Sequence, residues 1–523
     1  MTAEPRQARG LQALLRRLRW IHLAPVLAFV ALSAWGFASP VGAAPDDDYH
    51  LVSIWCADGG GAQCEPGTSD RTRSMSKAFG EITCYAEHAK ESAACQTSIW
   101  NKPGRFVTDR GNFTGEYPPV YYAVMHIFAG SDIQVSALLI REINAFLFVA
   151  LSTALGALLP RSRRSSLFWG WLIASVPLGM FIIASDNPST WAITGIGTDF
   201  LALRGWFETA GRRRWALGAL YLLGMLMASG ARGDAAVYAI GATVTAGILS
   251  AERTRDWALR AILPLIAIAI AVVFFATATQ AGVATGGFTG GSAADAAAGG
   301  GPVHPTGWAL AAYNLLMLPY LWTGVWGTWA LGWFDTTLPA VVPWAAAAAF
   351  IAVAFAGLGK LSWRKAISLA GVLLVLIVLP VYVLTVGGEQ VGNSLQPRYL
   401  LPLILLFSLL LTTMPPGAAL RFTRLQTFVI VAALAGANLV ALQVNIRRYI
   451  TGVVQQGIDL DAGAQWWWPG FPVGPIWVWI IGSLAFAGLL VVLWPQLRWP
   501  VPEPLLPVRQ SFAGAKAGAE VVR

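Results

Sequence analysis

Apolar tracts of about 20 residues recur along most of the chain, and this repetition constrains the fold more than any other feature. A tract of that length crosses the hydrocarbon core of a bilayer as one helix. Of the 523 residues, 56% are hydrophobic and 12% are charged, whereas about 25% are charged in an ordinary soluble protein. The sequence therefore predicts an all-α, multi-pass integral membrane protein.

Twelve tracts are predicted to cross the membrane, with both termini in the cytoplasm. Arginine and lysine cluster in the links 161–164, 212–214, 253–255, 360–365 and 421–424, which the positive-inside rule assigns to the cytoplasm. The net charge of +9 thus reflects topology, and no nucleic-acid partner is expected. The predicted spans are 21–41, 133–159, 167–184, 190–206, 215–231, 235–250, 259–278, 338–359, 366–386, 399–414, 426–444 and 475–494.

Two apolar tracts allow a second interpretation. The tract 308–331 would place the basic link 360–365 outside if it were a span, so we interpret it as an interfacial or re-entrant segment. The first tract, 21–41, follows an arginine-rich tail and leads into the small residues 38–44. A cleaved signal peptide is therefore the alternative to a retained first span.

The cysteines give independent evidence on topology. All four lie in the polar stretch 46–117, namely Cys56, Cys64, Cys84 and Cys95. An even number confined to one polar loop indicates disulfides in an oxidising compartment. Three pairings are open, and we predict the local one, Cys56 with Cys64 and Cys84 with Cys95. Zinc binding is the alternative, but no CxxC spacing supports it. The loop is therefore expected to be extracytoplasmic, as the charge rule also predicts.

With this topology, the unusual polar residues gather on the extracytoplasmic side. The stretch PDDDYH, residues 45–50, directly follows the first span. A carboxylate beside apolar surface can have a raised pKa and accept a proton from a hydroxyl group. A solvated helix cap is the alternative, and a divalent metal on the Asp and His residues also stays open. Within the second span, Arg141 and Glu142 are adjacent and do not face each other on a helix, so a structural ion pair with another span is the alternative to a functional role.

Several blocks in a fixed order resemble a known superfamily. The blocks are PDDDYH, YPPVYY (117–122), Arg141, SDNPS (185–189), GWFDTTLP (332–339) and QPRYLLP (396–402). They resemble the GT-C glycosyltransferases, integral membrane enzymes that use lipid-phosphate-linked sugars. Over residues 21–445 they resemble more closely a bacterial family of predicted membrane proteins, a domain of unknown function whose first block usually reads PDE-x-x-H. Here Asp47 replaces that Glu and Asp48 stands where Pro is frequent, so Asp46 and Asp47 both stay candidates for the base. Arg232 stands where Lys is common.

The resemblance implies an enzyme of the bacterial plasma membrane with its site on the outer face. It would transfer a sugar from a polyprenyl-phosphate donor to a cell-envelope glycan or glycolipid acceptor, with inversion, and would contact membrane lipid. The implied roles are a base at Asp46 or Asp47, donor-phosphate binding at Arg232, Arg398 and Arg141, and substrate orientation by His50, Tyr117, Tyr121, Asn187, Asp335 and Gln396. The segment 308–334 could hold the lipid.

The implied organisation has five parts. They are a cytoplasmic tail (1–20), a GT-C-like module (21–278) with the loop 42–132, an outer loop with an interfacial segment (279–337), C-terminal helices (338–494) and a tail (495–523).

Three other functions are weighed against the transferase. A polymerase or ligase of lipid-linked polysaccharide would favour arginine-rich outer loops, such as Arg447 and Arg448 before the loop 449–474. The WWWPGFP stretch of that loop could stack on sugar rings or anchor at the interface. A transporter would need polar sites at mid-membrane and usually internal repeats. Here the charges lie mostly at one face and the two halves show no repeat, which argues against it. A non-catalytic assembly subunit is the remaining alternative.

Overall fold

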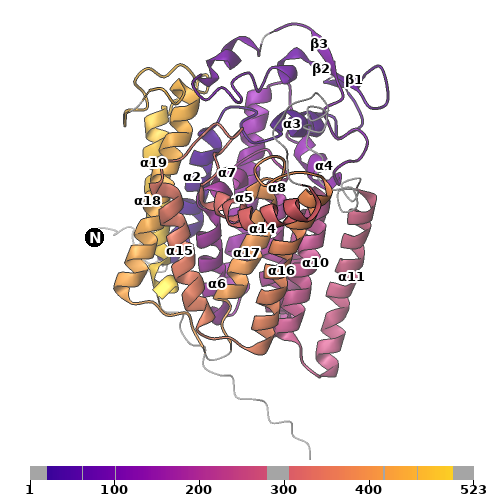
Figure 1. Ribbon diagram of the computed structural model, residues 1–523, viewed down its shortest axis with the longest axis vertical. Helices are drawn as coiled ribbons and strands as arrows, with labels where there is room; N and C mark the ends of the chain where they lie inside the picture. The colour runs from indigo at the N-terminus through magenta and orange to yellow at the C-terminus, as the bar shows by residue number, and fades with distance from the viewer. Residues whose placement is uncertain are drawn as a thin grey trace, which may run out of the picture.

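The computed structural model describes residues 20–278 and 306–498, apart from residues 62, 101, 416, 417 and 456. The predicted tails and the Gly/Ala-rich stretch of the predicted outer loop lie outside, or almost wholly outside, these residues. The long helices stand side by side along the long axis of the molecule, and the polar loop after the first apolar helix covers one end of them (Figure 1). We call this loop, residues 42–132, the cap.

Each predicted span coincides with helical structure, and one of them is interrupted. The tract 167–184 forms two helices, α6 and α7, that separate at Val176 and Pro177 because proline cannot continue a helix. The bundle helices are α2 (Ala24–Phe37), α5 (Ile133–Leu158), α6 (Arg161–Ser175), α7 (Leu178–Ile183), α8 (Ser189–Glu208), α9 (Gly211–Ala231), α10 (Gly233–Ser250), α11 (Arg255–Thr277), α15 (Val341–Leu358), α16 (Trp363–Val386), α17 (Pro397–Thr412), α18 (Arg424–Thr451) and α19 (Pro475–Arg498).

Seven helices in the described ranges are long and apolar enough to cross a membrane, namely α5, α10, α11, α15, α16, α18 and α19. The chain is therefore a multi-pass membrane protein, while the number twelve stays a prediction. The helices α2 and α17 are apolar but shorter. The helix α8 carries charged residues although it is almost wholly buried among other helices. At its last residue, Glu208 forms ion pairs with Arg163 and Arg204, which compensate the charge.

The segment predicted to be interfacial forms helix α14 (Gly307–Thr323) and a short 3-10 turn, Gly324–Trp326. This helix runs across the bundle rather than along it (Figure 1). Such an orientation fits a segment lying at the level of the interface better than a span.

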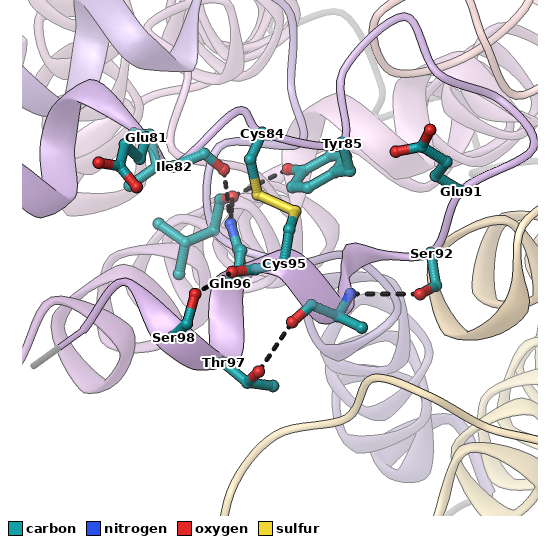
Figure 2. The surroundings of a disulfide bond; sticks show 12 residues. Glu81, Ile82, Cys84, Tyr85, Glu91, Ser92, Cys95, Gln96, Thr97 and Ser98 are labelled. Carbon is teal, nitrogen blue, oxygen red and sulfur yellow. Dashed lines mark hydrogen bonds between the residues drawn. A yellow bond between two sulfur atoms is a disulfide. The ribbon is translucent and has the colours of Figure 1, made fainter. Parts of the chain in front are cut away.

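The cap contains two short helices, α3 (Asp47–Trp55) and α4 (Val120–His126), and 3-10 turns at Lys77–Gly80 and Ala93–Ser98. A small antiparallel sheet in the order β1-β2-β3 is formed by Cys64–Pro66, Arg73–Ser76 and Arg105–Thr108. Both predicted disulfides are confirmed, Cys56–Cys64 and Cys84–Cys95. Figure 2 shows the second one, beside which the Gln96 amide donates to the carbonyls of Ile82 and Val41 at 2.6 and 2.7 Å.

The backbone that leads from α2 to PDDDYH is held by side chains from distant parts of the chain. Its carbonyl oxygens at residues 36, 39 and 40 accept hydrogen bonds from Arg141, and that of Val41 also accepts from Tyr85. Trp468, Asn445 and Trp333 donate to the carbonyls of Phe37, Ala38 and Gly42. This anchoring sets the position of the acidic stretch relative to the whole bundle.

Candidate functional site

Asp46 occupies an unusual place in the backbone. It is the residue that precedes α3, and its φ of 63° and ψ of 18° lie in the left-handed region, which is uncommon for a residue other than glycine. Its side chain makes no capping hydrogen bond to the helix. The Pro45 carbonyl just before it accepts hydrogen bonds from Asn187 at 2.9 Å and from Arg398 at 2.6 Å. The carboxylate is therefore directed away from α3, at the cost of backbone strain.

The Asp46 carboxylate lies between two arginines. One oxygen pairs with Arg398, whose side chain is 2% exposed, and the other lies 3.3 Å from Arg110, whose side chain is 48% exposed. Burial alone would raise the pKa of Asp46, but the positive charge of Arg398, with a contribution from Arg110, lowers the pKa to about 2. Asp46 itself stays 32% exposed. It is thus an ionised carboxylate that stays accessible at the cap.

Asp47 has a different environment, and this separates the two candidates for the base. Its side chain is fully buried, and one oxygen accepts a hydrogen bond from the Ala44 amide at 2.9 Å. Burial, together with the nearby Asp186 carboxyl, raises the pKa of Asp47 well above its usual value. Asp47 therefore supports the turn from inside the protein, and Asp46 is the one of the two carboxylates that stays accessible.

Arg398 and Arg232 flank one aromatic ring. Their guanidinium carbons lie 4.8 and 4.6 Å from the centre of the Tyr399 ring, and Arg232 also lies 5.6 Å from the Tyr117 ring. Such contacts attract a cation to the face of an aromatic ring. Arg232 forms a two-point ion pair with Asp234, with both N–O distances 2.9 Å. The predicted arginines 232 and 398 are thus brought together, next to the predicted Tyr117.

His50 is buried beside these groups. Its Nδ1 is 2.9 Å from the Tyr122 hydroxyl, while its Nε2 is buried without a hydrogen-bond partner. The His50 ring packs edge-on against the Tyr117 ring at 5.4 Å. Burial lowers the pKa of His50, so the ring is neutral at pH 7 and can accept or donate one further hydrogen bond.

A cavity of about 20 Å³ opens beside Arg398. Its polar lining residues are Gln396 and Arg398, and its apolar lining includes Pro45, Trp329 and Phe334. The Gln396 side-chain oxygen is buried there without a hydrogen-bond partner. A cavity of this volume has room for about one water molecule, and it lies where Arg398 meets the segment 308–334.

Four predicted site residues lie elsewhere and have structural contacts. Arg141, predicted to bind phosphate, is buried, pairs with Asp186 at 2.8 Å and otherwise donates to backbone carbonyls. Tyr121 donates to the Asp186 carbonyl, and Asn187 donates to Pro45. Asp335 accepts from Arg448 at 2.7 Å and from the Glu87 amide at 3.1 Å. These four residues hold the loops around the site and do not line it.

The metal hypothesis does not fit the arrangement of the side chains. In the described part of the chain, no three His, Cys, Asp or Glu side chains are grouped so that they could hold a metal ion. Asp46 and Asp48 both pair with Arg110, and Asp46 also pairs with Arg398. Arginine side chains thus already supply the positive charge that a metal ion would bring to these carboxylates.

The residues that suggested a polymerase or ligase are also engaged in structural contacts. Arg447 donates to the carbonyls of Gly457 and Asp459, and Arg448 donates to those of Tyr85 and Glu91. The tryptophans of the WWWPGFP stretch pack inward, since Trp466 and Trp468 are only 3% and 4% exposed. They anchor the outer loop to the bundle rather than present rings to a glycan.

Two residues of the site were missed from the sequence. Arg110 is one of several basic residues in the cap, and nothing in the sequence distinguishes it from the others. Tyr399 follows Arg398 in the QPRY block, so its place in a motif was a usable signal. Arg110 is the second arginine beside Asp46, and Tyr399 is the ring that Arg398 and Arg232 both contact.

Comparison with known proteins assigns the chain to a family without a known activity. No curated protein and no solved structure matched the chain. The family described as "Predicted membrane protein (DUF2142)" matches residues 29–407. The match includes the cap, Asp46, Arg110, Arg232 and Arg398, and thus the whole candidate site. The chain belongs to this DUF2142 family of predicted membrane proteins.

Proposed function

We propose that this protein is a GT-C-type glycosyltransferase that moves a sugar from a polyprenyl-phosphate donor to a cell-envelope glycan or glycolipid on the extracytoplasmic face. The observation that carries the proposal is the reachable carboxylate of Asp46 between Arg398 and Arg110, with Arg232 on the same Tyr399 ring as Arg398. Guanidinium groups bind phosphate through paired hydrogen bonds. A carboxylate beside a phosphate site is the arrangement that deprotonation of an acceptor hydroxyl requires.

The proposed reaction has one bond formed and one broken. The acceptor hydroxyl oxygen attacks the anomeric carbon while its proton passes to Asp46. The bond between the anomeric carbon and the phosphate oxygen breaks, and polyprenyl phosphate leaves with the electron pair. Arg398 and Arg232 stabilise the negative charge that develops on this leaving group. Direct attack inverts the configuration at the anomeric carbon.

The pairing of Asp46 with arginines implies that the two substrates act in a fixed sequence. While Arg398 and Arg110 hold its pKa at about 2, Asp46 is a weak base. A donor phosphate bound to these arginines would compete with Asp46 for them, and the pKa of Asp46 would rise toward that of an ordinary carboxyl. We therefore expect the donor to bind before the acceptor is deprotonated.

The test is sugar transfer by purified protein in nanodiscs, with a panel of polyprenyl-phosphate sugars and cell-envelope acceptors. Wild type should release polyprenyl phosphate, and Asp46→Asn should lose about 10²- to 10⁴-fold in rate, the contribution typical of a general base. Asp70→Asn is the matched control, because Asp70 is an exposed carboxylate of the same cap.

Arg398→Gln should raise the KM for the donor at least tenfold, because charged hydrogen bonds contribute about 1.5–3 kcal/mol each. Equal rates in wild type and Asp46→Asn would refute the role of Asp46. Turnover of a lipid-linked oligosaccharide but of no single-sugar donor would establish a polymerase or ligase in place of the transferase.

A further inference from the structure

A second cavity lies far from the candidate site. It is a cleft of about 520 Å³ between α2, α5, α6 and α19. Most of its lining is apolar, including Ala28, Val149, Trp171 and Phe486. Its volume falls within the range of roughly 300–1,000 Å³ that is usual for ligand pockets. On α5, the lining residues Thr153 and Ala157 are exposed, so the cleft is open toward the bilayer.

The lining residues on α2, α5 and α19 place the cleft toward the end of the bundle opposite the cap. On α5 it is lined from Phe148 to Ala157, toward the end at Leu158. On α19 it is lined from Phe486 to Gln496, toward the end at Arg498. The cleft therefore belongs to the leaflet opposite the disulfide-bearing cap, whereas the candidate site lies at the cap.

The depth of the cleft matches one leaflet. Arg164 and Ser175 both line it and are eleven residues apart on α6, which corresponds to about 16 Å at 1.5 Å per residue. Half of the hydrocarbon core of a bilayer is about 15 Å thick. An acyl chain of that leaflet would fill the cleft from its rim to its closed end near Val176 and Met180.

The rim of the cleft carries polar and basic side chains. Arg164, His22 and Gln496 line it at the end away from the cap. Basic groups between transmembrane helices at this level attract anionic lipid head groups. An apolar cleft with a basic rim thus matches both parts of an anionic lipid.

We propose that this cleft is a binding site for an anionic glycerophospholipid, with one acyl chain between α2, α5, α6 and α19 and the phosphate at Arg164. The positions of the charges favour this ligand over the polyprenyl-phosphate donor. The proposed donor would place its phosphate beside Asp46 at the cap, whereas the basic side chains that line the cleft within the described part of the chain, Arg164 and His22, lie at the opposite end. This exclusion of the donor rests on the proposed transferase activity, whereas the volume, the apolar lining and the basic rim of the cleft do not depend on it.

The test is native mass spectrometry of the purified, delipidated protein. Phosphatidylglycerol, phosphatidylcholine with the same acyl chains, and polyprenyl phosphate are added separately and in competition. Gly156→Leu should fill the cleft, because a Cβ at residue 156 would meet only ordinary contacts, with Leu167 at 3.7 Å and Phe168 at 4.0 Å. Gly371→Leu on α16 is the control, because a Cβ there meets open space.

Wild type should bind phosphatidylglycerol more tightly than phosphatidylcholine, by about fivefold for one basic residue near the phosphate. Gly156→Leu should lose at least tenfold in lipid binding while its melting temperature stays near that of Gly371→Leu. Arg164→Gln leaves the apolar lining intact. This variant should lose the preference for phosphatidylglycerol but should still bind both lipids through their acyl chains.

If Gly156→Leu binds lipid as tightly as wild type, the acyl chain does not lie in this cleft and the proposal is overturned. An unchanged preference in Arg164→Gln would overturn the proposed place of the phosphate. Displacement of phosphatidylglycerol by an equal concentration of polyprenyl phosphate would assign the cleft to the polyprenyl-phosphate part shared by the donor and the released lipid. None of these measurements needs catalytic turnover. The lipid-binding result can therefore be interpreted even if the sugar-transfer test fails.

Discussion

Replacement of Arg141 by methionine is expected to destabilise the protein through one buried ion pair. Arg141 and Asp186 are 2% and 0% exposed in their side chains, and their N–O distance is 2.8 Å. Arg141→Met keeps much of the side-chain volume but leaves the Asp186 carboxylate buried without its cation. It also leaves the carbonyls of residues 36, 39 and 40 without this donor.

The magnitude follows from these contacts. Breaking a buried ion pair by removal of one partner costs about 3–5 kcal/mol, largely because the other charge stays buried. Asp186→Asn in the same background removes that charge. The double variant should therefore recover about 2 kcal/mol or more of the loss, and the coupling energy between the two positions should fall within the 0.5–3 kcal/mol typical of residues in contact.

The assay is unfolding in mixed detergent micelles, followed by tryptophan fluorescence for wild type, both single variants and the double variant. Sugar transfer by folded Arg141→Met should also fall, since the anchored carbonyls lead directly to Asp46. A loss below 1 kcal/mol for Arg141→Met, or strictly additive losses in the double variant, would show that the pair does not hold the outer end of α2.

Two further predictions concern the cap. The folded-state pKa of Asp46, about 2, is below its ordinary value of 3.8, so its ionised form stabilises the fold above pH 4 and loses this effect as the pH falls from 4 toward 2. The difference in melting temperature between wild type and Asp46→Asn should therefore shrink over that range, and a constant difference would contradict the pairing with Arg398. Cys84→Ala/Cys95→Ala should lose roughly 3 kcal/mol, as expected for closing a loop of 11 residues. Urea unfolding measures that loss, and an equal stability with and without reductant in wild type would contradict it.

Much of the fold was predictable because a bilayer demands it. A membrane span must be a long apolar helix, so the tracts in the sequence locate the helices, and the charge of the links orients them. The break in the tract 167–184, which forms the two helices α6 and α7, was harder to predict, although Pro177 was a visible signal. The disulfide pairing followed because cysteines that are close in sequence can pair without long-range information.

The candidate site was only partly predictable, for a physical reason. The sequence alone determined that the chain is a multi-pass helical membrane protein with an oxidised polar loop carrying an acidic cluster. It also identified Asp46, Arg232 and Arg398 through their motifs. The tertiary structure separated Asp46 from its neighbour Asp47, because adjacent carboxylates differ only in what surrounds them. The structure also shows that Arg141 pairs with Asp186 and supports the loops around the site, and that Arg110 lies beside Asp46. These pairings depend on helices and loops that are far apart in the sequence, so the sequence alone does not reveal them.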